Sequence, residues 1–191
     1  MLRHTVRTAA ACAALATLAA CATTPYAYPP PMAGGPPIGP IQPGPRLDPE
    51  DAPRILRDRP PLQCVPFARE VSGVAIWGDA HTWWAQAEGR YARSRTPEPG
   101  AVLVLHSYAG PNRGHVAVVT AVISAREIRI DQANWLNTGE VMVRVPVIDV
   151  SPDNDWSEVR VWHIPTEAWG ARRYPAHGFI LPRPAWADAV S

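Results

Sequence analysis

Short apolar runs recur along the C-terminal two thirds of the chain, and turn residues separate them. Each run is rich in valine or isoleucine and has the length of a single strand. The runs cover residues 101–106, 115–123, 127–134, 141–147 and 158–164. Because the connections between successive runs are short, we expect neighbouring strands to pair in the antiparallel sense.

Two helical patterns precede these runs. In residues 65–72 the apolar spacing predicts a helix that buries Phe67, Ala68 and Val71 on one face. A second helix is predicted over residues 80–88. Helices followed by strands predict an α+β fold, in which N-terminal helices pack on an antiparallel β-sheet.

The N-terminus has the pattern of an export signal. Residues 1–7 are basic and residues 8–20 are almost wholly small and apolar. Such a segment is too short to span a bilayer but is typical of a secretory signal peptide, which we predict over residues 1–20.

This segment ends in Leu18-Ala19-Ala20-Cys21, which resembles a bacterial lipobox. The resemblance implies cleavage before Cys21 and lipidation of that cysteine, which anchors the protein in a membrane. The non-acidic Ala22 favours the outer membrane or the periplasmic side of a Gram-negative envelope. The alternative is an ordinary signal peptide with a chance cysteine after it.

Proline dominates the next segment, residues 21–61, which holds many of the 23 prolines of the chain. Proline lacks an amide donor, so we predict a lipidated cysteine followed by a disordered tether. Charged residues 48–59 suggest a short helix at the edge of a domain. Residues 62–185 have the length of one domain, and residues 186–191 form a tail.

The charge balance offers no surface for nucleic acid, because the formal net charge is only +1. The 8 tryptophans are mostly interpreted as core residues, and Trp135 is predicted to form a wall of a cleft. The histidines outside the motifs described below lack a paired metal-ligand spacing, so we interpret them as structural or surface residues and predict no metal site. These are His81, His106, His163 and His177.

Cys64 is the candidate nucleophile. If Cys12 leaves with the signal peptide and Cys21 carries lipid, Cys64 is the only free thiol of the exported protein. A helix that begins beside it places unpaired amides and partial positive charge at the sulfur, which favours the thiolate. The same amides, and the side chain of Gln63, can hold the oxyanion of an acyl-transfer intermediate.

His115 is the candidate base. It follows Gly114 and opens an apolar strand, which would hold the imidazole on a rigid element. A single histidine at a strand start is more often structural. Together with Cys64, however, it supplies both halves of a cysteine–histidine dyad.

The strand at residues 127–134 supplies candidates for a third group that orients the imidazole. Alternation places Gln132 and Asn134 on the face of the isoleucines, and Asp131 on the other face. A bulge would reverse these faces. An amide can fix the histidine tautomer, so Asn134 is the first candidate, and Gln132 and Asp131 stay open.

Several motifs in order resemble the CHAP domain, the cysteine, histidine-dependent amidohydrolase/peptidase. They are Gln-Cys-Val-x-Phe-Ala, a tryptophan-rich second helix, Pro-x-x-Gly-Ala-Val, Gly-His-Val-Ala-Val-Val and Ile-x-Gln-Ala-Asn-Trp, within residues 62–137. The resemblance implies a papain-like fold, with the nucleophile at Cys64 and the base at His115. Many members have glutamate where this chain has Gln132.

The resemblance also implies peptidoglycan as the substrate and the cleavage of its amide bonds, as an N-acetylmuramoyl-L-alanine amidase or a peptide endopeptidase, without metal or cofactor. The alternative is a non-catalytic envelope lipoprotein that binds wall peptides or a partner through a degenerate cleft. Hydrolysis of a small-molecule amide is a further alternative.

Overall fold

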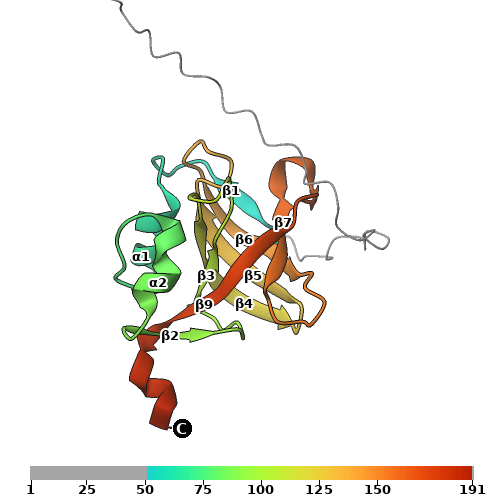
Figure 1. Ribbon diagram of the computed structural model, residues 1–191. Coiled ribbons are helices and arrows are strands. Elements are labelled where there is room, and N and C mark those ends of the chain that lie inside the picture. Colours follow the sequence, from blue (N-terminus) through green and yellow to red (C-terminus); the bar gives the residue numbers. More distant parts are fainter. Residues whose placement is uncertain (1–50, 191) are drawn as a thin grey trace, which may run out of the picture.

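Six antiparallel strands close into a β-barrel in the computed structural model, which describes residues 51–190 (Figure 1). They are β3 (Val102–Leu105), β4 (His115–Ser124), β5 (Glu127–Ala133), β6 (Val141–Asp149), β7 (Glu158–His163) and β9 (Tyr174–Pro184). Their order is β6-β5-β4-β3-β9-β7, and the pairing of β7 with β6 completes the ring. A closed ring leaves these strands without a free edge.

Three short strands extend the barrel, each on a different strand of the ring. The strand β1 (Arg54–Leu56) pairs with β6, β2 (Tyr91–Ser94) pairs with β9, and β8 (Ala168–Trp169) pairs with β7. The helices are α1 (Cys64–Ser72) and α2 (Trp83–Ala87), and 3₁₀ turns cover Ala80–Thr82, Ile164–Thr166 and Ala185–Val190. Both helices lie on the same side of the barrel (Figure 1).

The prediction of an α+β, papain-like fold with N-terminal helices packed on an antiparallel sheet is wrong, because the structure is mostly β and its sheet closes. The closing strand, β9, was not predicted. Its prolines and Gly178 interrupt the strand pattern in the sequence. Gly178 has a φ of +122°, and a Cβ at this position would lie 2.5 Å from the carbonyl oxygen of Ser94. Glycine therefore allows the close approach of β2.

The alternation of apolar residues on β3 and β4 serves two cores. Leu103 and Ala117 face the interior of the barrel, whereas Val104 and Val116 face outward under the helices. The outer core also contains Trp83, whose side chain is fully buried. Strands covered on both faces account for the continuous apolar runs in the sequence.

The first helix begins at Cys64, and Gly73 caps its end in a left-handed conformation, with its amide donating to the Arg69 carbonyl (3.0 Å). Phe67 and Ala68 are buried as predicted. Val71 is 47% exposed, so its predicted burial is wrong.

Other predictions fall on segments around the domain. The predicted short helix at residues 48–59 lies partly outside the described residues; residue 51 has 3₁₀ geometry, and β1 forms at Arg54–Leu56. The predicted signal peptide, the lipidation of Cys21 and most of the tether lie outside the described residues. In residues 51–190 no helix has the length and hydropathy needed to cross a bilayer.

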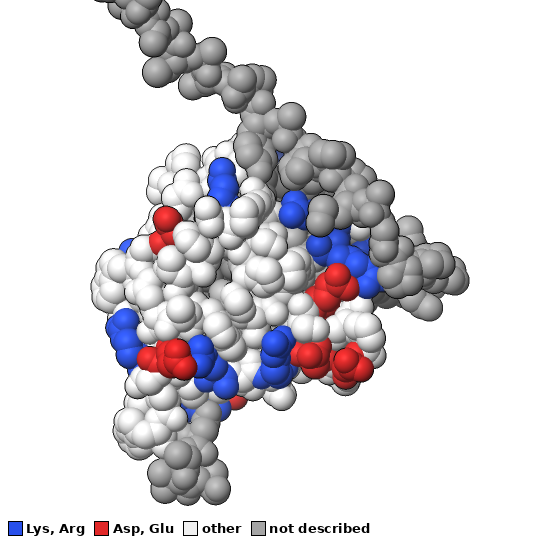
Figure 2. Space-filling view, in the orientation of Figure 1, with Lys and Arg blue, Asp and Glu red and all other residues white. Residues whose placement is uncertain are grey.

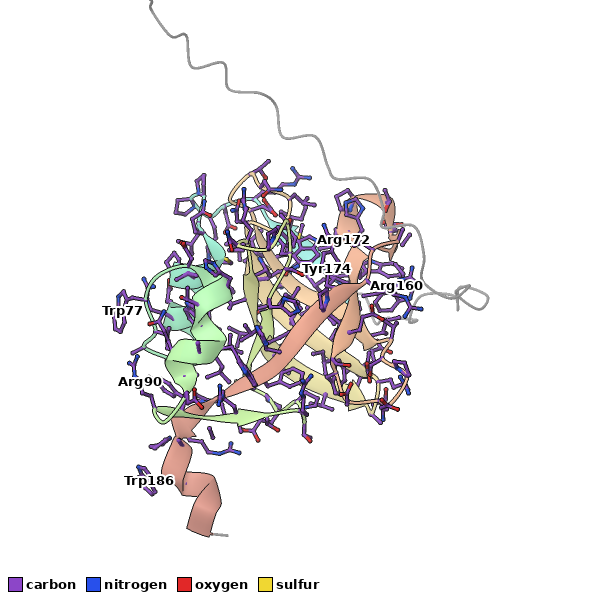
Figure 3. All side chains as sticks on the ribbon, in the orientation of Figure 1. Trp77, Arg90, Arg160, Arg172, Tyr174 and Trp186 are labelled. Carbon is purple, nitrogen blue, oxygen red and sulfur yellow. The ribbon has the colours of Figure 1, made fainter. Side chains whose placement is uncertain are left out.

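Charges of both signs are interspersed in a band across the lower part of one face, and most of the upper part of that face is uncharged (Figure 2). Exposed aromatic side chains lie at the periphery. Trp77 projects beside the helices and Trp186 projects from the C-terminal 3₁₀ turn (Figure 3). Arg172 stacks over the ring of Tyr174, which is itself buried (Figure 3).

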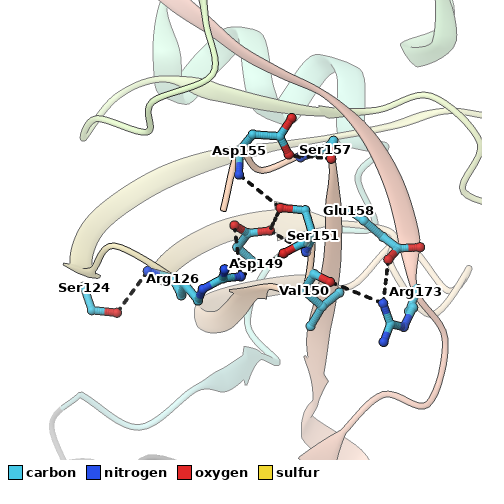
Figure 4. Close-up of polar contacts among 9 residues, drawn as sticks. All are labelled: Ser124, Arg126, Asp149, Val150, Ser151, Asp155, Ser157, Glu158 and Arg173. Carbon is cyan, nitrogen blue, oxygen red and sulfur yellow. Dashed lines mark hydrogen bonds and ion pairs between the residues drawn. The ribbon is translucent and has the colours of Figure 1, made fainter. Parts of the chain in front are cut away.

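A polar network holds the connection between β6 and β7, where the barrel closes (Figure 4). The Asp149 carboxylate accepts hydrogen bonds from the amide and hydroxyl of Ser151 (2.8 and 2.6 Å) and forms an ion pair with Arg126. Arg173, the residue before β9, donates to the carboxylate of Glu158 on β7 (2.7 Å).

Replacing Asp149 with alanine is expected to lower the free energy of unfolding by about 2–3 kcal/mol, because buried donors lose their acceptor. Urea denaturation of the full chain measures the effect. The exposed neighbour Asp153 is the matched control, and its alanine variant should differ from wild type by less than about 0.5 kcal/mol. Equal losses in the two variants would contradict a role of this network in closing the barrel.

Candidate active site

A pocket of about 380 Å³ opens where the start of α1 meets three loops. It is lined by Gln63, Cys64 and Val65 from α1 and its cap, residues 78–81 from the connection to α2, Tyr108 and residues 112–115 before and at the start of β4, and Asn134 and Asn137 after β5. The structure thus brings Cys64, His115, Asn134 and Gln63 to one pocket. It places Gln132 behind His115 and Asp131 elsewhere.

Cys64 lies at the first turn of α1, with the extended Gln63 before it. Burial raises the pKa of the Cys64 thiol, and the backbone amides of Val116, Val65 and Cys64 itself oppose this effect by lowering it. Because Val116 follows His115 directly on β4, the sulfur lies against the strand that carries the histidine. The charge of Arg113 also lowers the pKa of the thiol.

His115 is the first residue of β4 and is only 2% exposed. Its Nε2 donates to Oε1 of Gln132 (3.0 Å), a residue of β5 that is fully buried in the barrel. An amide oxygen only accepts hydrogen bonds, so Nε2 carries the proton and Nδ1 is the basic nitrogen of the neutral ring. Burial lowers the pKa of His115 to about 4, although the bond to Gln132 and the charge of Glu140 raise it.

Aromatic rings enclose the imidazole on its barrel side. Tyr108 lies 5.3 Å from the His115 ring centroid and Trp135 lies 5.0 Å from it, and the Tyr108 hydroxyl donates to the Trp135 carbonyl. Trp135 is 6% exposed and does not line the pocket, so it is a packing partner of His115 rather than the predicted wall of a cleft. This packing fixes the plane of the ring.

Asn134 does not reach His115, because it follows the end of β5 and adopts a left-handed φ of +61°. Its Nδ2 donates to Oε1 of Gln63 (2.7 Å), and its Oδ1 accepts from the amide of Gly139 (2.8 Å). With its oxygen engaged in this way, Gln63 keeps its own Nε2 donors for the pocket. The geometry therefore joins Gln132 to the histidine, and Asn134 to the residue before the cysteine.

Asp131 lies on the opposite face of β5, as the alternation predicted. Its carboxylate accepts from the amide of Arg144 (2.8 Å) at a bulge between β5 and β6. Burial raises the pKa of Asp131. The bulge does not turn this carboxylate toward the pocket, so Asp131 is not a partner of His115 in the structure.

The pocket is also lined by residues that were not predicted as site residues from the sequence, and three of them carry charged or imidazole side chains. Arg113 and Asp79 place charges of opposite sign at the pocket, and His81, interpreted as structural, lines it as well. The position of Arg113 two residues before His115 was the one available signal. Among the residues that the structure describes, no three His, Cys, Asp or Glu side chains gather at a point where they could bind a metal.

Gly114 permits the contact between two of the pocket loops. A Cβ at this position would lie 2.6 Å from the backbone nitrogen of His81 and 2.8 Å from the carbonyl oxygen of Leu105. Neither backbone atom can move independently of its element. The absence of a side chain therefore lets the loop before β4 pack on the loop before α2.

The variant Gly114→Ala is expected to lower the free energy of unfolding by about 2 kcal/mol through overpacking. Thermal unfolding of the full chain measures this change. Gly110→Ala is the matched control in the same loop, since a Cβ there meets nothing within 4 Å although its φ is +120°. Because Gly110→Ala is itself strained by the positive φ, a loss no larger at position 114 than at position 110 would contradict the importance of the contact between the loops.

Comparison with known families gives one match. Residues 57–134 match the family model described as CHAP domain. No curated protein matches the chain. The family match supports a CHAP domain in this part of the chain, in agreement with the resemblance noted in the sequence. CHAP domains are generally cysteine- and histidine-dependent amidohydrolases, and such a domain suggests a peptidoglycan amidase or peptidase function in general.

Proposed function

We propose that this protein hydrolyses amide bonds of peptidoglycan through Cys64 as nucleophile and His115 as general base. One observation carries the proposal. The Cys64 sulfur accepts a hydrogen bond from the backbone amide of Val116, the residue after His115. Nε2 of His115 is bonded to Gln132, and Cys64 and His115 line one pocket that is open to solvent. A nucleophile, a base and a group that orients the base are the parts that a thiol hydrolase needs.

The protonation states support attack by a thiol that loses its proton during the reaction. Burial raises the pKa of Cys64 and lowers that of His115, so both side chains are neutral near pH 7 in the free pocket. The pair therefore does not rest as thiolate and imidazolium. The base must accept the proton as the sulfur attacks, and Nδ1 of His115 is the nitrogen free to do so.

The sulfur of Cys64 attacks the carbonyl carbon of the scissile amide while its proton passes to Nδ1 of His115. The backbone amide of Cys64 and the Nε2 of Gln63 hold the oxyanion, and Asn134 keeps Gln63 in place. His115 then protonates the leaving amine as the C–N bond breaks, which leaves a thioester on Cys64. Finally His115 takes a proton from water as the water oxygen attacks the thioester carbon. The C–S bond breaks, the carboxylic acid leaves, and His115 returns the proton to the sulfur, which restores the thiol.

We further propose that the enzyme acts from a lipid anchor at Cys21, on the periplasmic side of a Gram-negative envelope. The lipobox-like Leu18-Ala19-Ala20-Cys21 and the proline-rich residues that follow support this proposal. A semi-rigid tether would let an anchored domain reach the wall. Labelling of expressing cells with a radioactive fatty acid tests it, with Cys21→Ser as the control; label on both proteins would contradict it.

Incubation of the full chain with purified peptidoglycan tests the enzymatic proposal, with Cys64→Ala as the control. Mass spectrometry of the soluble products identifies the new termini and thereby separates an amidase from an endopeptidase. We expect fragments from wild type only. Equal product from the two proteins would end the proposal.

A non-catalytic wall-binding lipoprotein is the second candidate. The observation that favours it is that, among the described residues, the uncharged Gln132 and not a carboxylate is hydrogen-bonded to the ring of His115. An amide stabilises an imidazolium less than a carboxylate does. Sedimentation with peptidoglycan, without release of fragments, would support this candidate.

A further inference from the structure

Two loops of the pocket carry opposite charges close to the point where the loops touch. Arg113 lies one residue before Gly114, and Asp79 lies two residues before His81. Gly114 packs against the backbone of His81, and both charged residues line the pocket with Cys64. The contact between the loops therefore brings an acidic residue and a basic residue to the pocket that holds the nucleophile.

The carboxylate of Asp79 is available to a ligand. Asp79 precedes the 3₁₀ turn at Ala80–Thr82 with the extended backbone of an N-cap, yet its side chain makes no capping hydrogen bond. Within residues 51–190 none of the six ion pairs involves it. Aspartate at this position usually accepts from the first amides of the turn. Here Asp79 lines the pocket without making such a cap.

The guanidinium of Arg113 acts on the same space from the other loop. Its positive charge lowers the pKa of the Cys64 thiol, and Arg113 is among the residues that line the pocket. Arginine binds a carboxylate through two parallel hydrogen bonds when geometry allows. The pocket of Cys64 therefore offers a ligand one residue that prefers an ammonium ion and one that prefers a carboxylate.

We propose that the pocket selects peptides that present a free amine and a free carboxylate on one side chain beside the scissile amide. This is the α-amino-acid zwitterion at the free end of a diamino-dicarboxylic acid residue. Asp79 receives the ammonium group and Arg113 receives the carboxylate. The proposal rests on the proposed function for the position of the scissile bond, but the recognition itself requires only binding.

Calorimetric titration of the full-chain Cys64→Ala variant tests the recognition without turnover. The ligands are three synthetic tetrapeptides with one diamino-dicarboxylic acid residue, whose free end is unmodified, acetylated on the amine, or amidated on the carboxylate. We expect each modification to weaken binding about three- to tenfold, as loss of one partly solvated ion pair does. Adding Asp79→Asn should remove the effect of acetylation only, and adding Arg113→Gln the effect of amidation only.

Exchanges at exposed positions away from the pocket, Asp153→Asn and Arg57→Gln, are the charge-matched controls and should leave all three affinities unchanged. Equal affinity for the three peptides, no binding of any of them, or equal losses in both pocket variants would overturn the proposal. Cleavage by wild type without this selectivity would overturn it and leave the proposed function standing. Selective binding without cleavage of peptidoglycan would support the recognition and overturn the proposed function.

Discussion

Replacing Cys64 with alanine is expected to remove amide hydrolysis, and replacing His115 with glutamine in addition is expected to remove nothing more. Each single replacement should lower kcat/KM by about 10⁴-fold or more, and the double replacement by about the same factor, because nucleophile and base act as one unit. The neutral state of both groups strengthens this expectation. A thiol whose pKa is raised by burial attacks only if His115 takes its proton.

Release of fragments from peptidoglycan by the full chain measures these rates, and thermal unfolding establishes that each variant is folded. His115→Gln removes a ring that packs against both Tyr108 and Trp135, so some loss of stability is expected there. Asn112→Ala is a control for the pocket surface, since Asn112 is an exposed lining residue without a proposed role in the chemistry. Losses that multiply in the double variant would show that the two residues act independently and would refute the dyad.

The sequence predicted the local elements better than their assembly. The five predicted strands correspond to β3–β7, and both helices begin within three residues of their predicted starts. Closure of the sheet was not predictable from these elements, because it depends on β9. In that strand Pro175 and Pro182 interrupt the apolar pattern, and an irregularity at Gly178 shifts the alternation, so that Tyr174 and Phe179 both belong to the barrel core. These residues form a strand because β9 pairs with β2 and β3, and the local sequence pattern does not reveal this pairing.

The same limit applies to the candidate site. Alternation along β5 placed Gln132 with the isoleucines and Asp131 on the opposite face, which the structure confirms. It also grouped Asn134 with Gln132, but the left-handed backbone at Asn134 ends the alternation one residue earlier. The partner of His115 is therefore the residue that stays inside the barrel. Asp79 and Arg113 meet at the pocket only through the contact at Gly114, which depends on tertiary structure.

Burial of a neutral His115 is expected to make the fold sensitive to mild acid. The unfolded chain binds a proton at this residue near the ordinary pKa of 6.5, whereas the folded protein does so only near 4. Between these values the unfolded state holds more protons, so the free energy of unfolding rises with pH. The contribution of His115 is complete above the unfolded value and is lost as pH falls toward 4, by about 3 kcal/mol in all.

Urea denaturation of the full chain between pH 7.5 and about pH 4 measures this slope, and His115→Gln should remove most of it. The slope is compared, rather than the stability at one pH, because the replacement also changes packing. Other groups with shifted pKa values act in or near this range, and the lowered pKa of Asp155 adds to the slope at its acid end. The lowered pKa of His177 adds to the slope, and the raised pKa of Asp131 opposes it. His177→Asn is therefore the matched control, and it should retain most of the wild-type slope. If His115→Gln and wild type lose stability in parallel as the pH falls, His115 is not held neutral in the barrel, and its assignment as the neutral base that accepts the thiol proton fails with it.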